Sequence, residues 1–176
     1  MRICFIRHAS DIKSKVLGED TSISMAGKMQ VKQAIRYYDK ERAKVIYTSP
    51  CKRALQTAEI IAKRYNIPIV VMPELAERIK YDYQKGSEQE RIFMENYLNY
   101  DFDTDEFESC KKYIDRNFKA FDQIIANHYE KDENVILVGH SATLYALNTY
   151  FTGIPKDNQI VWLQCGNCSM IKFEKR

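Results

Sequence analysis

Short apolar runs alternate with longer stretches of helical period along this chain. Residues 2–6 form the first apolar run, which is rich in β-branched and aromatic residues, as is typical of a buried strand. Comparable runs predict strands at 44–47, 69–72 and 134–140. Elsewhere the apolar residues recur with the period of an amphipathic helix, and they predict helices at about 25–40, 51–65, 88–98, 108–130 and 141–153.

The end of the chain carries a different pattern, "QIVWLQCGNCSMIKFEK" at 159–175, which predicts two strands joined by a turn at Gly166-Asn167. Taken together, strands that alternate with helices favour an α/β fold, in which helices cover both faces of a largely parallel sheet. No repeat or linker interrupts the pattern, and 176 residues is an ordinary length for one domain. The sequence therefore predicts a single domain over 1–176.

Composition and charge narrow the class of protein. The formal net charge of +3 is too small and too dispersed to indicate a nucleic-acid partner. No run of eighteen apolar residues is present, so we expect no membrane span. Five cysteines at scattered spacings do not form a disulfide framework, which favours a reducing compartment and a cytoplasmic protein.

Charged and imidazole side chains follow several of the predicted strands. Arg7 and His8 end the first strand, and His140 ends the strand at 134–140. Arg53 lies at the start of the helix after the second strand, and Glu77 comes shortly after the third. Because ligands of open α/β sheets bind beyond the carboxyl ends of the strands, we expect these five side chains to share one site.

This set of side chains suits the chemistry of a phosphate ester. Two guanidinium groups match the oxygens of a phosphoryl group and neutralise its charge. A neutral imidazole can attack phosphorus, and a carboxylic acid can protonate the leaving alkoxide and then activate water. The arginines and His140 would supply the positive charge that a metal supplies elsewhere, so the chemistry requires no metal and no cofactor.

Taken singly, each of these residues also has an ordinary structural interpretation. A histidine at a strand end is often only a hydrogen-bonded core residue. Arg53 fits the exposed face of an amphipathic helix, and Glu77 beside Arg78 fits an exposed ion pair of little energetic weight. The third histidine, His128, lies in a polar helix end, where we expect it to be solvated. The catalytic interpretation rests on convergence at one edge of the sheet.

Six segments in order along nearly the whole chain carry a resemblance to one family. They are "FIRHAS" at 5–10, "DTSISMAGKMQVKQA" at 20–34, "IYTSPCKRALQTAEII" at 46–61, "LAE" at 75–77, Glu108-Ser109 followed by Arg116, and "VILVGHSATLYAL" at 135–147. In this order they resemble the histidine phosphatase superfamily, the phosphoglycerate-mutase-like or RHG-motif proteins. The resemblance implies a three-layer sandwich with a mixed, mostly parallel sheet between helices, and a small cap formed by residues 80–110.

The resemblance also implies a role for each matching residue. His8 would be the phosphorylated nucleophile, Arg7 and Arg53 would bind the phosphoryl oxygens, and Glu77 would donate the proton. His140 would bind and stabilise the group in transfer. The protein would then be a phosphatase acting on a small phosphorylated metabolite through a phosphohistidine.

Several positions depart from the family pattern. Ala9 replaces a glycine after the nucleophile, and Ser14 replaces an asparagine that contacts phosphate. Ser141, whose backbone N–H is expected to join the phosphate pocket, replaces a common glycine. The Trp-Glu-Gly segment usual after the acid is absent, which keeps Asp82 open as an alternative to Glu77.

Two other motifs point to different chemistry. "GHSAT" at 139–143 nearly matches the G-x-S-x-G elbow of serine hydrolases, but no histidine follows Ser141 to act as its base. Cys165 and Cys168 form a C-x-x-C, which lies in a predicted hairpin turn and supplies only half of a zinc site. We interpret them as two free thiols.

Three alternatives to a metabolite phosphatase remain open: a phosphoglycerate-type mutase, a phosphatase of phosphohistidine proteins, and an inactive phosphate-binding module. The chain is short for a mutase, which must shield the phosphohistidine from water. Lys80, Lys85 and Arg91 are candidates to meet a second anionic group of the substrate. The sequence does not indicate an oligomeric state. One arrangement is a dimer in which two copies pair through an edge strand or through the tyrosine-rich cap at 80–110.

Overall fold

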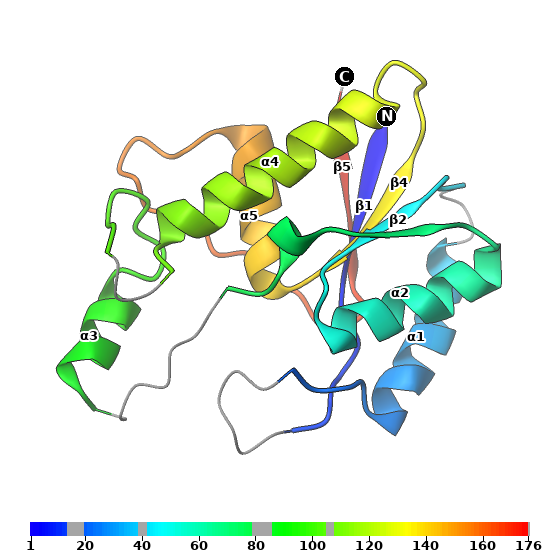
Figure 1. Cartoon of the computed structure of the whole chain (residues 1–176), viewed down its shortest axis with the longest axis horizontal. Coiled ribbons are helices and arrows are strands. Elements are labelled where there is room, and N and C mark those ends of the chain that lie inside the picture. Colours follow the sequence, from blue (N-terminus) through cyan, green and yellow to red (C-terminus); the bar gives the residue numbers. More distant parts are fainter. Residues whose placement is uncertain (14–19, 39–41, 79–85, 105–107, 176) are drawn as a thin grey trace.

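The computed structural model describes residues 1–13, 20–38, 42–78, 86–104 and 108–175 (Figure 1). Within these ranges five strands form one sheet in the order β3-β2-β4-β1-β5. The strands are β1 (Arg2–Arg7), β2 (Ile46–Thr48), β3 (Ile69–Val71), β4 (Val135–Gly139) and β5 (Met170–Glu174). The first four run parallel, and β5 pairs antiparallel with β1 at the edge.

Helices connect the parallel strands and cover both faces of the sheet (Figure 1). They are α1 (Met25–Tyr38), α2 (Lys52–Tyr65), α3 (Glu88–Glu95), α4 (Cys110–His128) and α5 (Ser141–Thr152), with a short 3-10 turn, η1 (Pro73–Leu75). Helices α1 and α2 lie on one face, and α4 and α5 lie on the other. The expected three-layer α/β sandwich with a mostly parallel mixed sheet is confirmed.

The side chains of β1 show how the two helical layers pack on the sheet. Because successive residues of a strand point to opposite faces, Cys4 and Ile6 pack into the cluster with α1 and α2. Ile3 and Phe5 pack into the cluster with α4 and α5. A strand buried on both faces has a continuous apolar sequence, which is why the first apolar run predicts this strand well.

One predicted element is wrong. Residues 159–165 do not form a strand, although the strand after the turn is present. The turn lies at Asn167-Cys168, one residue later than expected, with Ser169 N–H donating to Gly166 O at 3.2 Å. This apolar segment instead pairs with the chain just after α3, where Ile160 N–H donates to Leu98 O at 2.8 Å and Gln159 forms an isolated bridge with Asn99. Trp162 in this segment stays 45% exposed, and the segment pairs with none of the five strands of the sheet.

Residues 86–104, here called the α3 segment, extend to one side of the sandwich beyond α4 (Figure 1). Ser87 caps α3 by accepting the N–H of Glu90. Among the described helices, none is long and apolar enough to cross a membrane.

Candidate active site

The carboxyl ends of three neighbouring strands form the edge that carries the candidate residues. Arg7 of β1 is in register with Gly139 of β4, and Thr48 of β2 is in register with Val138. Just beyond these ends, His8 N–H donates to Gly139 O at 2.9 Å and Ser49 N–H donates to Val138 O at 3.1 Å. The sheet therefore brings the residues just after β1, β2 and β4 to one place.

The two histidines at this edge face each other, with ring centroids 5.2 Å apart. His8 Nδ1 lies 2.8 Å from the carbonyl oxygen of Ala9. A carbonyl only accepts, so Nδ1 carries the hydrogen and Nε2 is the unprotonated nitrogen of the neutral ring. Burial lowers the pKa of His8 to about 4, against the raising effect of the Ala9 hydrogen bond. At neutral pH the ring is thus a neutral imidazole with a free lone pair at Nε2.

His140 is fully buried, and its ring lies between Ser49 and Glu77. Its Nε2 lies 2.8 Å from Ser49 Oγ, and its Nδ1 lies 3.3 Å from Glu77 Oε2 without the geometry of a hydrogen bond. Burial is the main cause that holds the pKa of His140 well below the ordinary value, and repulsion from a protonated His8 and from Arg53 acts in the same direction. This direction favours a neutral ring in the free protein, and the expected positive charge of His140 beside a bound phosphoryl group stays a prediction.

Arg53 and Glu77 complete the cluster. Arg53 Nη2 lies 3.7 Å from Glu77 Oε2, and Arg53 Nη1 lies 3.9 Å from Asp20 Oδ1. The Arg53 side chain is only 13% exposed, so the interpretation as a surface residue is wrong. Glu77 is 27% exposed and accepts the backbone N–H of Arg78 at Oε1. A carboxyl group that lies close to both Arg53 and His140 can, when it is protonated, donate its proton to a group bound between them.

Arg7 lies at the end of β1, next to His8. Its Nη1 donates to the carbonyl oxygen of Cys165 at 2.6 Å, and its Nε is buried with no hydrogen-bond partner in the described part of the chain. A guanidinium has five N–H donors, so Arg7 keeps donors for an anion. Ser141 follows His140 as the first residue of α5, where backbone N–H groups have no partner within the helix.

Other candidates lie outside the described residues or are engaged elsewhere. Ser14, Asp82, Lys80 and Lys85 fall outside the described ranges. Arg91 is on the exposed surface of α3, where it forms ion pairs with the glutamates of its own helix, Glu88 and Glu95.

The chain that follows His8 is held by the side chains of α1 and α2. Ala9 N–H donates to Thr57 Oγ1, and Ser10 N–H donates to Gln30 Oε1, each at 3.0 Å. A Cβ on Gly27 would lie 2.1 Å from the carbonyl oxygen of Ser10, so only glycine lets α1 approach this closely. Ala9 is not among the described residues with positive φ, so its methyl group causes no backbone strain.

Gly139 has a similar reason to be glycine. A Cβ there would lie 2.8 Å from Thr143 Oγ1, which accepts the backbone N–H of His140 and so helps to begin α5. At Gly139 the end of β4 therefore comes close to Thr143 in the first turn of α5, and His140 is placed directly at the start of that helix.

The turn that contains the C-x-x-C holds the nucleophile segment. Asn167 Nδ2 donates to His8 O at 2.7 Å, and Cys168 N–H donates to Arg7 O at 3.0 Å. Cys165 packs on the side of α4 and α5, whereas Cys168 packs on the side of α1 and α2, and both are free thiols as expected. Sequence reasoning missed Asn167, because no local pattern marks a side chain that binds 159 residues away.

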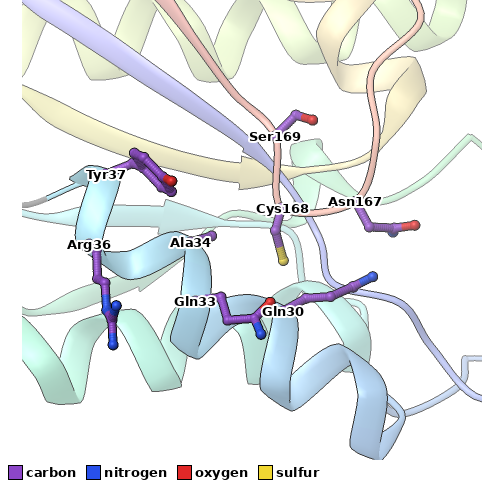
Figure 2. A pocket seen from close by; sticks show the side chains of 8 residues that line it. All are labelled: Gln30, Gln33, Ala34, Arg36, Tyr37, Asn167, Cys168 and Ser169. Atoms are coloured by element: carbon purple, nitrogen blue, oxygen red, sulfur yellow. The ribbon is translucent and has the colours of Figure 1, made fainter.

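A cavity of about 670 Å³ lies between this turn and α1 (Figure 2). Asn167 and Cys168 line it from the turn, and Gln30 and Gln33 line it from the helix. Its walls include Gln30 and Asn167, the two amide side chains that hydrogen-bond to the backbone of Ser10 and His8. None of the five candidate catalytic side chains lines it, so the cavity is separate from the candidate active site.

His128 is not solvated, contrary to the expectation. Its Nε2 lies 2.9 Å from the Tyr47 hydroxyl, and its Nδ1 lies 2.9 Å from Glu133 Oε2. The side chain is 11% exposed and ties the end of α4 to β2. It plays a structural part away from the two strand-end histidines.

The family model of the histidine phosphatase superfamily (branch 1) matches residues 3–176. The chain belongs to this superfamily. It is 28% identical to the uncharacterized phosphatase PhoE of Bacillus subtilis (strain 168), over 97% of this chain and 88% of the relative. It is 30% identical to the metal-independent phosphoserine phosphatase of Arabidopsis thaliana, over 82% of this chain and 66% of the relative.

Solved structures share the fold at lower identity. A mycobacterial glucosyl-3-phosphoglycerate phosphatase superposes with a TM-score of 0.80 at 23% identity, covering 99% of this chain and 90% of that one. A phosphoserine phosphatase of Entamoeba histolytica, solved with 3-phosphoglyceric acid, superposes with a TM-score of 0.67 at 18% identity, covering 98% of this chain and 90% of that one. The family, the fold and the phosphatase relatives together support a phosphatase.

Proposed function

We propose that this histidine phosphatase is a metal-independent phosphomonoester hydrolase that works through a phosphohistidine on a small phosphorylated metabolite. The observation that carries the proposal is the meeting of a neutral His8 with His140, Arg53 and Glu77 at one sheet edge. Binding alone needs neither a nucleophile nor an acid, so this set favours turnover over an inactive phosphate-binding module.

In the first step, Arg7 and Arg53 bind the phosphoryl oxygens and His8 Nε2 attacks phosphorus. The bond from phosphorus to the ester oxygen breaks as the bond to Nε2 forms. Glu77, in its protonated form, gives its proton to the departing oxygen, so that the product leaves as an alcohol. The Nδ1–H···O bond to Ala9 holds the ring in the tautomer that this attack needs.

In the second step, water attacks the phosphohistidine. The Glu77 carboxylate takes a proton from that water, the bond from phosphorus to Nε2 breaks, and inorganic phosphate leaves. His140 begins as a neutral group, and the negative charge of a bound phosphoryl group would raise its pKa. It would then donate a hydrogen bond to the transferring oxygens in both steps.

The relatives suggest which esters to try first. Two of them are named for phosphate compounds that bear a carboxylate, as phosphoserine phosphatase and glucosyl-3-phosphoglycerate phosphatase. We therefore propose phosphoserine and 3-phosphoglycerate as the first substrates for assay, followed by sugar phosphates.

The test is phosphate release from these esters and from p-nitrophenyl phosphate with EDTA present, using wild type, His8→Ala and His128→Ala. We expect His8→Ala to lower kcat on the order of 10³-fold, because no other group replaces the nucleophile. His128→Ala is the matched control and should stay within about 3-fold, a change of less than 1 kcal/mol in the barrier. Hydrolysis by His8→Ala at the wild-type rate would overturn the phosphohistidine mechanism, and loss of activity in EDTA would overturn metal independence.

A further inference from the structure

Arg78 follows the proposed acid directly and is one of the largest fully buried side chains of the protein, with 1% exposure. This contradicts its interpretation as half of an exposed pair with Glu77. A guanidinium is charged at every physiological pH, and burying it is costly unless its donors are satisfied. The neighbours of Arg78 therefore show what the residue does.

The guanidinium of Arg78 joins two parts of the chain that are distant in sequence. Its Nε donates to the carbonyl oxygen of Glu108 at 3.1 Å, just before α4, and its Nη1 donates to the carbonyl oxygen of Tyr97 in the α3 segment. The group also lies over the ring of Tyr97, 4.3 Å from its centroid, and 5.4 Å from the ring of Phe93. The α3 segment thus holds Arg78 by a hydrogen bond and by two aromatic faces.

The backbone of Arg78 reaches the acid itself. Its N–H donates to Glu77 Oε1 at 3.1 Å, while Oε2 of the same carboxylate faces Arg53 and His140. A shift of Arg78 would therefore turn the carboxylate away from the site. The short chain from 74 to 77 is fixed on its other side by Arg116, which donates to the carbonyls of Glu74 and Ala76 and pairs with Glu108.

We propose that Arg78 is a positioning residue that couples the α3 segment to the acid Glu77. With the α3 segment packed on Arg78 as in the structure, the guanidinium is fixed and Glu77 Oε2 faces Arg53 and His140. A movement of the α3 segment would release Arg78 and with it the proton donor. This inference rests on the proposed function, because it gives Glu77 its role as the acid.

The test compares two aryl esters of similar shape, phenyl phosphate and p-nitrophenyl phosphate. Nitrophenolate leaves without help, whereas phenolate needs the proton of Glu77. We expect Arg78→Met to lower kcat/KM, which reports the first step alone, about 10- to 100-fold for phenyl phosphate and less than about 3-fold for p-nitrophenyl phosphate. Arg78→Lys, which keeps the charge but loses the planar fork, should fall between wild type and Arg78→Met.

Two controls separate positioning from general damage. Arg91→Met removes an arginine of the same segment that is exposed and paired within α3, and it should leave both rates unchanged. In a Glu77→Gln background, Arg78→Met should cause no further loss, since the two changes act through one group. An equal fall in kcat/KM for both esters, or the same fold-loss with Glu77 already replaced, would overturn the proposal.

A readout without turnover keeps this inference distinct from the proposed function. The ¹³C resonance of the Glu77 carboxylate, assigned by its loss in Glu77→Gln, should move in Arg78→Met and Arg78→Lys and stay in place in Arg91→Met. An unmoved resonance in both Arg78 variants would overturn the coupling, whatever the activity. Failure of the proposed function would show instead as hydrolysis that survives His8→Ala.

Discussion

At the scale of single residues, burial outweighs charge in setting the state of the two site histidines. His140 lies 3.3 Å from a carboxylate, an arrangement that by itself favours the imidazolium. Desolvation nevertheless holds its pKa well below the ordinary value, and desolvation also dominates for His8. The resting site therefore combines guanidinium cations with two neutral rings, which leaves His8 free to attack.

Glu77→Gln tests the proton donor at this scale. The amide keeps the size of the side chain but cannot give up a proton, so we expect kcat for phosphoserine to fall on the order of 10²-fold or more. For p-nitrophenyl phosphate the first step should be nearly unaffected, and a burst of nitrophenolate should precede slow hydrolysis of the phosphohistidine. Rapid-quench kinetics measure both phases. Unchanged turnover of phosphoserine would remove Glu77 from the role and make Asp82 the next candidate.

The residue scale also shows what a sequence can and cannot predict. The sequence places Arg7, His8 and His140 at one edge, as the structure does, because each follows a strongly apolar strand and parallel strands end together. The sequence predicts an exposed Arg78, because an arginine beside a glutamate is usually solvated, and this prediction is wrong. Its burial depends on aromatic faces from residues 93 and 97, and no local pattern indicates such a contact.

At the scale of elements, the site depends on how closely α1 approaches the chain after β1. Ser24 begins α1 by accepting the N–H of Gly27, and its own hydroxyl donates to Ser10 O at 3.1 Å. Ser24, Gly27 and the chain at 8–11 therefore pack together as one unit. The sequence predicts the helix, but the close approach of Gly27 to Ser10 depends on the tertiary structure.

Gly27→Ala tests this unit. The new Cβ would lie 2.1 Å from the carbonyl oxygen of Ser10, so the helix or the segment at 8–11 must move. We expect a loss of roughly 1–3 kcal/mol in the free energy of unfolding, as for overpacking elsewhere, with a lower rate of His8 phosphorylation. Ala26→Gly, at the exposed neighbouring position, is the control and should cost no more than about 1 kcal/mol. Urea unfolding and single-turnover assays give the two quantities. Wild-type stability in Gly27→Ala would contradict the close approach.

The error at 159–165 also belongs to the element scale. The segment has the apolar composition of a strand, but it pairs at its start with residues 98 and 99, through Ile160 N–H to Leu98 O and a bridge between Gln159 and Asn99, and not at the edge of the sheet. Composition predicts that a segment will pair with another extended segment, and it does not say which one. The same contact attaches the α3 segment to the body of the protein, which a sequence-based topology does not foresee.

At the scale of the whole molecule, the neutral histidines link catalysis to acid stability. The pKa of His8 is about 4 in the folded protein and about 6.5 in the unfolded chain. Between these values the unfolded chain binds a proton that the folded protein does not. The free energy of unfolding is therefore at its full value above about pH 6.5 and decreases as the pH falls towards 4.

For His8 alone this decrease amounts to about 3 kcal/mol, and His140 acts in the same direction. His8→Gln removes the proton that only the unfolded chain accepts, so its loss of stability between pH 6.5 and 4 should be smaller than that of wild type by about the same amount. Urea unfolding at several pH values measures the two curves. Parallel stability curves for wild type and His8→Gln would show that His8 has the same pKa in the folded and unfolded states. Burial would then not be the reason that the nucleophile is neutral. A reduced slope would show that the site keeps its nucleophile unprotonated at a cost in acid stability that the rest of the fold must offset.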